Sequence, residues 1–489
     1  MRTAFALCAA ALLRTYAAHA QAPFSLDTTF RATFPTWYVA SALPLPDGKV
    51  LVAGQVHPPD EPFPLIHAGL CRLNADGSWD ESFPESSIGR GKITPWVDRF
   101  YVSSSQTVRR VHYNGAQDFS FIEMNLGLYF TSLQGGDYHV FPDGRVVMSG
   151  MHMLNDPVRG FVGDYNFIWF SNQGYLDTTR THRSGNGALY DFIELPDGKF
   201  IADYNGTVYD GRPTSGIQRM HPDGSLDTTF WAGAGYANIG EFLPTTNGRV
   251  YVGGSMVISG EPDTLNLVRM LPNGSLDPSF NNHHDLGLSA LSGIDGVVSG
   301  IYPFDGDKLI IVGAFESIDG QPYKSIAVID TTGTLLPIGA GTGCGNYTYQ
   351  GFTYGGFDAL VPCGVDSFYI YGAYHGYNDG AVNDPAQRFI SRLVGPYLEV
   401  GIPAEDARNA PHWSLQPNPA QDLVTITCPT CEGLAQIVIQ DAIGRDVHRA
   451  TVNGERFDLQ IPALSHGAYT VALMHQGQAL GVKRLLIQP

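Results

Sequence analysis

The residues that could do chemistry are few and scattered. His283, His284 and Asp285 are consecutive and could supply metal ligands or an acid–base pair. Neighbouring side chains of an extended chain point to opposite sides, so we expect the two histidines to face apart in a solvated loop. Neither the Gly-x-Ser-x-Gly elbow of serine hydrolases nor the His-Glu-x-x-His motif of zinc proteases occurs. Local motifs therefore predict no catalytic residue and no metal or cofactor site.

Two further patterns could bind a ligand. The run GAGTGCG at 339–345 has the composition of a phosphate loop, but its spacing differs and no helix is predicted to follow it. An aspartate recurs in the phrase Ser-Leu-Asp-x-x-Phe, at Asp27, Asp227 and Asp277, and could bind structural calcium. Calcium loops carry acidic ligands at alternate positions, whereas each copy here has one or two acidic residues. We expect a structural turn, with calcium as the alternative.

The most suggestive surface is aromatic and lies within residues 339–377. We predict ligand contacts from five of its tyrosines, which are Tyr347, Tyr349, Tyr354, Tyr374 and Tyr377. Exposed tyrosines among glycines provide adaptable contact area at low entropic cost, as at recognition surfaces. The alternative is a core role, because Tyr369 and Tyr371 in the same segment alternate as residues of a strand do.

The first residues have the pattern of an export signal. Arg2 precedes an apolar run from Ala4 to Leu13, and Ala18-His19-Ala20 has the small-x-small form of a cleavage site. The apolar run is shorter than the roughly 18–20 residues that a membrane span needs. We predict a signal peptide over residues 1–20 and no transmembrane segment.

Export to an oxidising compartment would give the cysteines a role in disulfides. Cys428 and Cys431 are close enough for a local disulfide, and no second pair of ligands completes a zinc site. Cys344 and Cys363 are a weaker candidate pair, which leaves Cys71 over.

The composition favours a large, folded, acidic protein. The chain has 489 residues, of which 43% are hydrophobic, enough for two or three domains with packed cores. Its formal net charge of −18 argues against nucleic acid as a partner, because phosphate binding needs a basic surface. The 57 glycines and 32 prolines lie in short turns, which fits many short strands.

Two phrases alternate along residues 23–394. One is a β-rich run after a Pro-Asp-Gly turn, as in LPDGKFIADY (195–204), and the other is a strand, a turn and a short strand, as in IQRMHPDGSLDTTF (217–230). Asp-Gly and Asn-Gly pairs close hairpins because glycine accepts positive φ. Each cycle thus predicts four antiparallel strands, and seven cycles predict a seven-bladed β-propeller. An open β-solenoid is the alternative.

The phase of the repeat predicts how the ring closes. The seventh cycle ends at residues 388–394 without its Ser-Leu-Asp strand, and that strand stands instead at Ser25–Phe30. A ring leaves no exposed sheet edge when one chain end completes the last blade. We therefore predict that Ser25–Phe30 lies beside Phe389–Val394, which a solenoid would not require.

The Ser-Leu-Asp-x-x-Phe phrase resembles the delta-60 repeats of bacterial secreted proteins, over most of residues 23–394. This resemblance implies a propeller-like fold and no particular activity. Residues 395–412 lose the repeat and are predicted to be a linker. Beyond them, six or seven short strands in residues 413–489 predict a small immunoglobulin-like β-sandwich.

Residues 413–489 also resemble a known family, the type A C-terminal sorting domain of the type IX secretion system of Bacteroidetes. The resemblance rests on WSLQPNPAQDLVTI (413–426), IQDAIGRDV (439–447), LSHGAYTV (464–471) and VKRLLI (482–487). It implies passage through the periplasm and outer membrane, followed by release or anchoring at the cell surface. The recognition marks that it implies are Pro417, Asn418, Pro419, Gly467, Tyr469 and Lys483, and ordinary sandwich packing is a compatible second role for them.

Together these observations predict a secreted or outer-membrane surface protein that is monomeric and non-catalytic. Its predicted partners are the type IX machinery and a glycan or protein ligand. A secreted, glycosidase-like hydrolase with carboxylates at the propeller mouth is the alternative. A structural protein of the surface layer is a third possibility.

Overall fold

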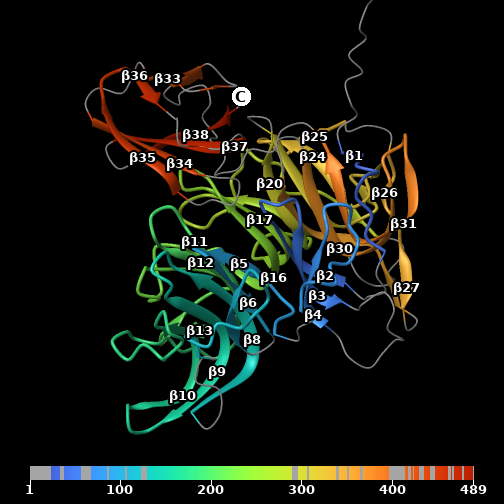
Figure 1. Cartoon of the computed structure of the whole chain (residues 1–489). Helices are drawn as coiled ribbons and strands as arrows, with labels where there is room; N and C mark the ends of the chain where they lie inside the picture. The colour runs from blue at the N-terminus through green and yellow to red at the C-terminus, as the bar shows by residue number, and fades with distance from the viewer. Residues whose placement is uncertain are drawn as a thin grey trace, which may run out of the picture.

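The computed structural model describes most of the chain between residues 24 and 487. The described ranges are 24–33, 38–56, 68–84, 88–104, 107–122, 129–288, 296–304, 308–337, 341–349, 352–363, 367–395, 413–416, 420–421, 423–428, 434–440, 446–460, 464, 467–475 and 478–487. Within these ranges every regular element is a strand and there is no helix (Figure 1). Accordingly, no helix of the described part is long and apolar enough to cross a membrane. The prediction of an all-β propeller followed by a sandwich is confirmed.

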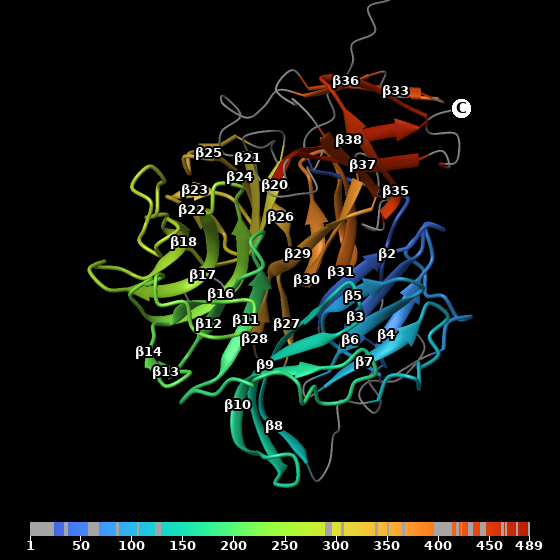
Figure 2. The ribbon, with the colours of Figure 1, turned by 90° about the vertical axis from the view of Figure 1, so that its left-hand side faces the viewer.

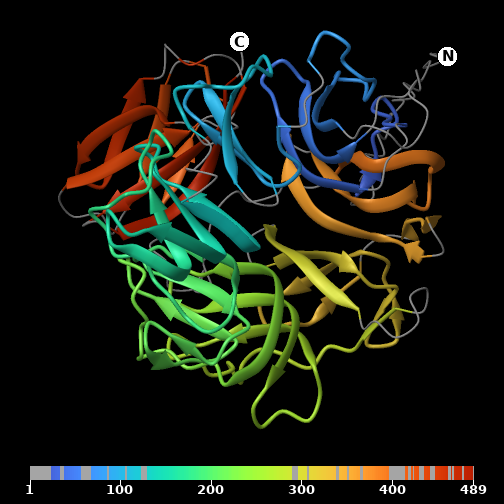
Figure 3. The ribbon, with the colours of Figure 1, turned by 90° about the horizontal axis from the view of Figure 1, so that it is seen from below.

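The strands of residues 25–394 pair into seven antiparallel units, here called blades one to seven in chain order, and the blades follow one another around a ring (Figures 2 and 3). Blades three and four also share one pair, Leu189 with Gly150. The main strands are β2 (Tyr38–Pro44), β3 (Val50–Val56) and β4 (Ala68–Leu73) in blade one; β5 (Ile93–Trp96), β6 (Arg99–Ser103) and β7 (Val108–His112) in blade two; β8 (Phe130–Val140), β9 (Val146–Asp156) and β10 (Phe161–Phe170) in blade three; β11 (Leu189–Glu194), β12 (Phe200–Tyr204) and β15 (Ile217–Met220) in blade four; β16 (Ala234–Pro244), β17 (Val250–Ile258) and β18 (Leu265–Met270) in blade five; β20 (Val297–Phe304), β21 (Lys308–Ala314), β24 (Ile326–Asp330) and β25 (Leu335–Leu336) in blade six; and β29 (Gly356–Pro362), β30 (Ser367–Asn378), β31 (Asn383–Val394) and β1 (Ser25–Leu26) in blade seven.

Further short strands lie in the loops of these units. They are β13 (Val208–Tyr209) with β14 (Arg212–Pro213), β19 (Leu286–Gly287) with β22 (Ser317–Ile318) and β23 (Gln321–Pro322), β26 (Gly343–Cys344) beside β30, and β27 (Tyr347–Tyr349) with β28 (Phe352–Tyr354). The hairpin turns have glycine at a position of positive φ, as predicted. Gly198 has a φ of 78°, and its amide donates to the Leu195 carbonyl at 2.9 Å between β11 and β12.

The N-terminal strand completes blade seven, as the phase of the repeat predicted. Ser25 pairs with Val394 and Leu26 with Leu393, antiparallel. The Leu26 amide also donates to Asp379 Oδ2 at 2.7 Å, and the Tyr377 hydroxyl donates to the Phe24 carbonyl at 3.0 Å. The pairing of Ser25–Leu26 with β31 is therefore confirmed.

The hydrophobic core of the ring is shared between blades. Each of its seven apolar clusters combines side chains of two consecutive blades, and one of them joins Val52 of blade one to Ile390 of blade seven. A blade of three or four strands cannot bury both of its faces alone. Stability of the ring therefore depends on every interface, including the one between the last blade and the first.

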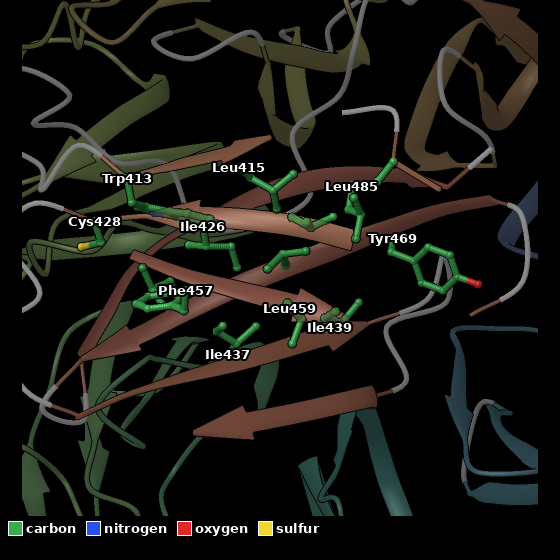
Figure 4. Packing of buried hydrophobic residues seen from close by; sticks show 14 of the residues in the cluster. Trp413, Leu415, Ile426, Cys428, Ile437, Ile439, Phe457, Leu459, Tyr469 and Leu485 are labelled. Carbon is green, nitrogen blue, oxygen red and sulfur yellow. The ribbon is translucent and has the colours of Figure 1, made fainter. Parts of the chain in front are cut away.

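The C-terminal sandwich has a core of its own. One sheet contains β32 (Ser414–Gln416), β33 (Leu423–Thr427) and β36 (Arg456–Gln460), and the other contains β34 (Leu434–Gln440), β35 (Asp446–Asn453), β37 (Gly467–His475) and β38 (Gln478–Ile487). Figure 4 shows Trp413, Ile426, Ile437 and Leu485 packed between them. All members of this cluster lie within residues 413–487, so the sandwich is a second domain.

Candidate functional site

The recurring aspartate of the repeat accepts hydrogen bonds from a nearby hydroxyl residue and from basic side chains, an arrangement that we call the clip. Asp227 Oδ1 accepts hydrogen bonds from the Thr229 amide at 3.0 Å and its hydroxyl at 2.5 Å. Asp227 Oδ2 accepts from Arg219 at 2.8 Å and Lys199 at 3.0 Å. Burial alone would raise the pKa of Asp227, but these hydrogen bonds hold it below its ordinary value. The predicted turn role is confirmed, and donors occupy the oxygens that calcium would need.

The arginine of the clip also ties one blade to the next. Arg219 of blade four donates to the Pro272 carbonyl of blade five at 2.7 Å. The same set of contacts recurs at four other interfaces, where the aspartate–arginine–carbonyl sets are Asp80, Arg72 and Tyr113; Asp118, Arg110 and Asn172; Asp277, Arg269 and Thr331; and Asp27, Arg392 and Ala75. The most regular sequence signal of the chain therefore serves assembly of the ring.

Two of the predicted ligand tyrosines are buried. Tyr374 is 0% exposed and donates to the Ser391 hydroxyl at 2.7 Å, and Tyr377 is 3% exposed. The prediction that these two residues form a ligand surface is wrong. Strand β30 changes register against β31 after Tyr371 and again after His375, so simple alternation does not determine which of its side chains face the core.

The remaining tyrosines of that segment form a short aromatic stack. The Tyr347 ring lies 4.3 Å from the ring of His375 and 5.3 Å from that of Tyr354, which is 37% exposed. Tyr349 belongs to β27, and its side chain lies outside the described part. Among the predicted tyrosines whose side chains the structure describes, Tyr354 is thus the exposed ring, at the end of a stack.

The two histidines face apart as expected, but His284 is buried rather than solvated, and one predicted cysteine pair is not formed. His284 Nδ1 lies 2.8 Å from Asp319 Oδ2, whereas His283 Nε2 lies 3.5 Å from Glu261, so the two rings face different partners. Cys344 and Cys363 are both free thiols, which corrects the predicted disulfide between them. The Cys344 thiol donates to the Ser325 hydroxyl at 2.9 Å instead, because it lies buried in the core between blades six and seven.

Cys71 forms no disulfide and is buried in the cluster between blades seven and one. Cys428 is disulfide-bonded, and its predicted partner Cys431 lies outside the described residues. Among the cysteines that the structure describes, Cys363 is the partly accessible thiol outside any disulfide.

The described sorting marks pack in the sandwich. Tyr469 is 9% exposed within the apolar cluster, Gly467 begins β37, and Lys483 Nζ lies 5.4 Å from the Trp413 ring centre. Pro417, Asn418 and Pro419 lie outside the described residues. Packing alone accounts for the positions of Tyr469 and Lys483.

A charged group from four blades was not foreseen. The first strands of six blades, all but blade two, contain a register shift near the same point, and bulges of this kind re-aim side chains. Lys92 just before β5, Asp137 in β8, Asp191 in β11 and Glu241 in β16 occupy this level. Lys92 Nζ and Asp137 Oδ2 form an ion pair of 2.7 Å. We call these four residues the axial charged group.

Two carboxyl groups of this set, those of Asp191 and Glu241, have raised pKa values. Burial raises the pKa of Asp191 to about 7, and the negative charge of Asp137 adds to the effect while Lys92 opposes it. Burial raises the pKa of Glu241 to about 8. Asp191 is exposed to water. The protein around its carboxyl group nevertheless weakens the hydration of the charged form, which raises the pKa.

This arrangement can bind and exchange protons. Lys92 Nζ donates to Asp137 Oδ2, while Glu241, whose pKa is raised to about 8, keeps a proton near neutral pH and can donate a hydrogen bond. In the described part of the chain, no three His, Cys, Asp or Glu residues are placed to hold a metal ion. Hydrogen bonding or acid–base chemistry is therefore what the group offers.

The sequence does contain a signal for this group. Asp137 and Asp191 each stand five residues before the proline of a Pro-Asp-Gly turn, and Lys92 and Glu241 occupy the same phase in their cycles. Aligning the cycles on the turn would have brought four charged residues into one column. A search for local motifs misses it, because about one cycle separates each member from the next.

Comparison with known proteins identifies the C-terminal domain. Residues 414–488 match the family described as secretion system C-terminal sorting domain. The sandwich is a sorting domain of the type IX secretion system. The sorting domain directs the chain to the cell surface or to secretion. Residues 195–230 and 245–280 match a beta-propeller family described as domain of unknown function DUF5122. No curated protein matches the chain.

Two solved structures with a similar course of the chain are an extracellular domain and a bacterial surface protein. The extracellular domain of BT4673 from B. thetaiotaomicron is 12% identical, with a TM-score of 0.41, and the match covers 96% of this chain and 60% of that one. PorZ, a surface component of the type-IX secretion system of Porphyromonas gingivalis, is 12% identical with a TM-score of 0.35, and the match covers 91% of this chain and 64% of PorZ. The chain thus spans less than two thirds of either relative.

Proposed function

We propose that the chain is an extracellular, non-catalytic binding protein, exported by the type IX system, whose propeller holds a glycan at the axial charged group. The observation that carries this proposal is the ion pair of Lys92 with Asp137, together with Asp191 and Glu241 from two further blades, which interact electrostatically with the same lysine. Sugar hydroxyls both donate and accept hydrogen bonds, and a set that combines an ammonium group with carboxyl groups offers both donors and acceptors. Ligands of repeat folds often sit where loops and strands of several repeats converge.

A secreted hydrolase is the second candidate, and one observation favours it. Glycosidases pair a carboxylic acid of raised pKa with an ionised carboxylate. The pKa of Glu241 is raised to about 8, as a general acid requires, and Asp137 is a second carboxyl group at the same level, in an ion pair with Lys92. The two candidates differ in whether a bound glycan is turned over.

A glycan array and a polysaccharide hydrolase panel on the purified full chain would separate the candidates. We expect binding without turnover, and roughly fivefold or greater weakening in Asp191→Asn and Glu241→Gln, since a hydrogen bond between neutral groups contributes about 1 kcal/mol. Asp98→Asn, an exposed carboxylate of blade two, is the matched control. Turnover that Glu241→Gln abolishes would establish the hydrolase, and absence of any glycan binding would contradict the proposal.

A further inference from the structure

A pocket of about 160 Å³ lies between blades seven and one. Blade seven contributes Asp27, Cys363, Ser367, Tyr369 and Arg392, and blade one contributes Pro44, Leu45, Gly48 and Lys49. One water needs roughly 10–15 Å³ of such space, so the pocket has room for a larger group. It lies at the closure of the ring and is separate from the axial charged group.

The pocket coincides with a missing side chain of the repeat. In blades one, two, four and five, a basic residue at or just before the start of the second strand bonds the clip aspartate. Lys49 does so to Asp80 at 2.7 Å and Lys199 to Asp227 at 3.0 Å. In blade seven the equivalent residue is Ser367, which begins β30. A serine is far shorter than a lysine, so the space beside the aspartate is left unfilled.

The exposure of the clip aspartates confirms the difference. The Asp27 side chain is 18% exposed, compared with 6% for Asp80 and 1% for Asp227. Asp27 Oδ2 accepts from Arg392 at 2.7 Å, while Asp80 Oδ2 accepts from both Arg72 at 2.6 Å and Lys49 at 2.7 Å. The clip of blade seven therefore has the arginine, Arg392, but has a serine where blades one and four have a lysine.

We infer that this pocket binds a primary alkylammonium group, which takes the place that a lysine occupies in blades one and four. The ammonium would donate to Asp27 Oδ2 as Lys49 and Lys199 donate to their aspartates, with the alkyl chain beside Leu45 and Tyr369. The added charge is tolerable, because blades one and four already hold one aspartate, one arginine and one lysine in this arrangement.

The state of Asp27 suits this role. Burial tends to raise its pKa, but hydrogen bonds from Thr29 and Arg392 lower it below the ordinary value, so the carboxylate is ionised at neutral pH. The ammonium could belong to a lysine side chain of a polypeptide or to a free amine. The chemistry at Asp27 is the same for both, and an experiment can tell them apart.

The test measures binding to the full chain by calorimetry. The probes are n-butylamine and lysine blocked as Nα-acetyl-lysine methylamide, with n-butanol and the Nε-acetylated lysine derivative as neutral controls. We expect both amines to bind and both neutral controls to bind roughly tenfold or more weakly, because the charged hydrogen bond is lost. Tighter binding of blocked lysine indicates a polypeptide ligand, and tighter binding of butylamine a free amine.

Two substitutions test whether amine binding depends on the unfilled space beside Asp27, which we call the Ser367 vacancy. Ser367→Lys restores the repeat and should reduce amine binding roughly tenfold or more, because its own ammonium fills the place. Lys199→Ser opens the matching vacancy in blade four and should add a second amine site. Amine binding that is unchanged in Ser367→Lys, or neutral controls that bind as well as the amines, would overturn the inference. Should Ser367→Lys fail to fold, an unchanged number of amine sites in Lys199→Ser would overturn it as well.

Discussion

The ring and the sandwich bury their hydrophobic residues in different ways. Every apolar cluster of the ring is shared by two neighbouring blades, whereas the sandwich encloses one cluster made from its own two sheets. Loss of one element of the ring therefore disturbs two interfaces, while the described apolar cluster of the sandwich contains no ring residue. We therefore predict that the ring unfolds as one cooperative unit and that the sandwich can be removed without loss of ring stability.

The largest expected effect is from removal of the closing strand. Deletion of residues 23–30 takes away Leu26 and Phe30, which are buried in two different clusters, and exposes the edge of β31. The ring should lose more than about 5 kcal/mol of unfolding free energy, because each buried side chain of this size contributes about 2–5 kcal/mol. Chemical denaturation followed by tryptophan fluorescence measures this loss. A stable ring without residues 23–30 would show that blade seven does not need the N-terminal strand.

Breaking one clip should have the next largest effect. Asp227→Ala leaves Arg219 and Lys199 without their carboxylate in a site where Asp227 is 1% exposed. We expect a loss of about 3–5 kcal/mol, the usual result when one partner of a buried ion pair is removed. In the sandwich, Asp458→Ala removes an exposed hydrogen bond with Thr425 and should cost less than about 1 kcal/mol. Equal losses from the two substitutions would mean that the clip is not an assembly device.

A buried carboxyl of the ring should make its stability depend on pH. Burial, reinforced by the charge of Asp191, raises the pKa of Asp203 to about 8 in the folded ring. The folded state therefore holds a proton that the unfolded state releases above about pH 4, so stability is greatest below pH 4 for this group and falls as pH rises to 8.

The expected fall between pH 5 and pH 8 is on the order of 2 kcal/mol after relaxation around the charge is allowed for. Unfolding curves at the two pH values, with the variant Asp203→Asn as control, test this. The asparagine variant should show a smaller fall than the wild type. The Asp203 assignment is contradicted when both proteins lose stability equally.

The smallest expected effect on the ring follows from truncation after Gln416. The ring should keep its unfolding midpoint, because the sandwich cluster contains no ring residue. Delivery should fail completely, since the truncation removes most of the sorting domain, and the protein should accumulate in the periplasm. Cell fractionation and denaturation of the purified fragment measure the two outcomes. Normal surface delivery would contradict the role of residues 414–488.

The amino-acid sequence by itself determined the features that repeat or that lie close together along the chain. Asp-Gly turns and alternating β-branched residues specify the hairpins, and the phase of the repeat specifies that Ser25–Leu26 completes blade seven. The order of motifs in residues 413–489 identifies the sorting domain. Such features depend on local conformational preference, which the chain carries in every segment.

Only the tertiary structure decided which distant side chains meet. Register shifts in β30 bury Tyr374 and Tyr377, and packing between blades keeps the thiols of Cys344 and Cys363 apart from each other. The axial charged group and the Ser367 vacancy each gather residues from different blades, which local patterns cannot bring together. The physical reason is that a bulge shifts side-chain direction by one position, and ring closure then fixes which neighbours each side chain has.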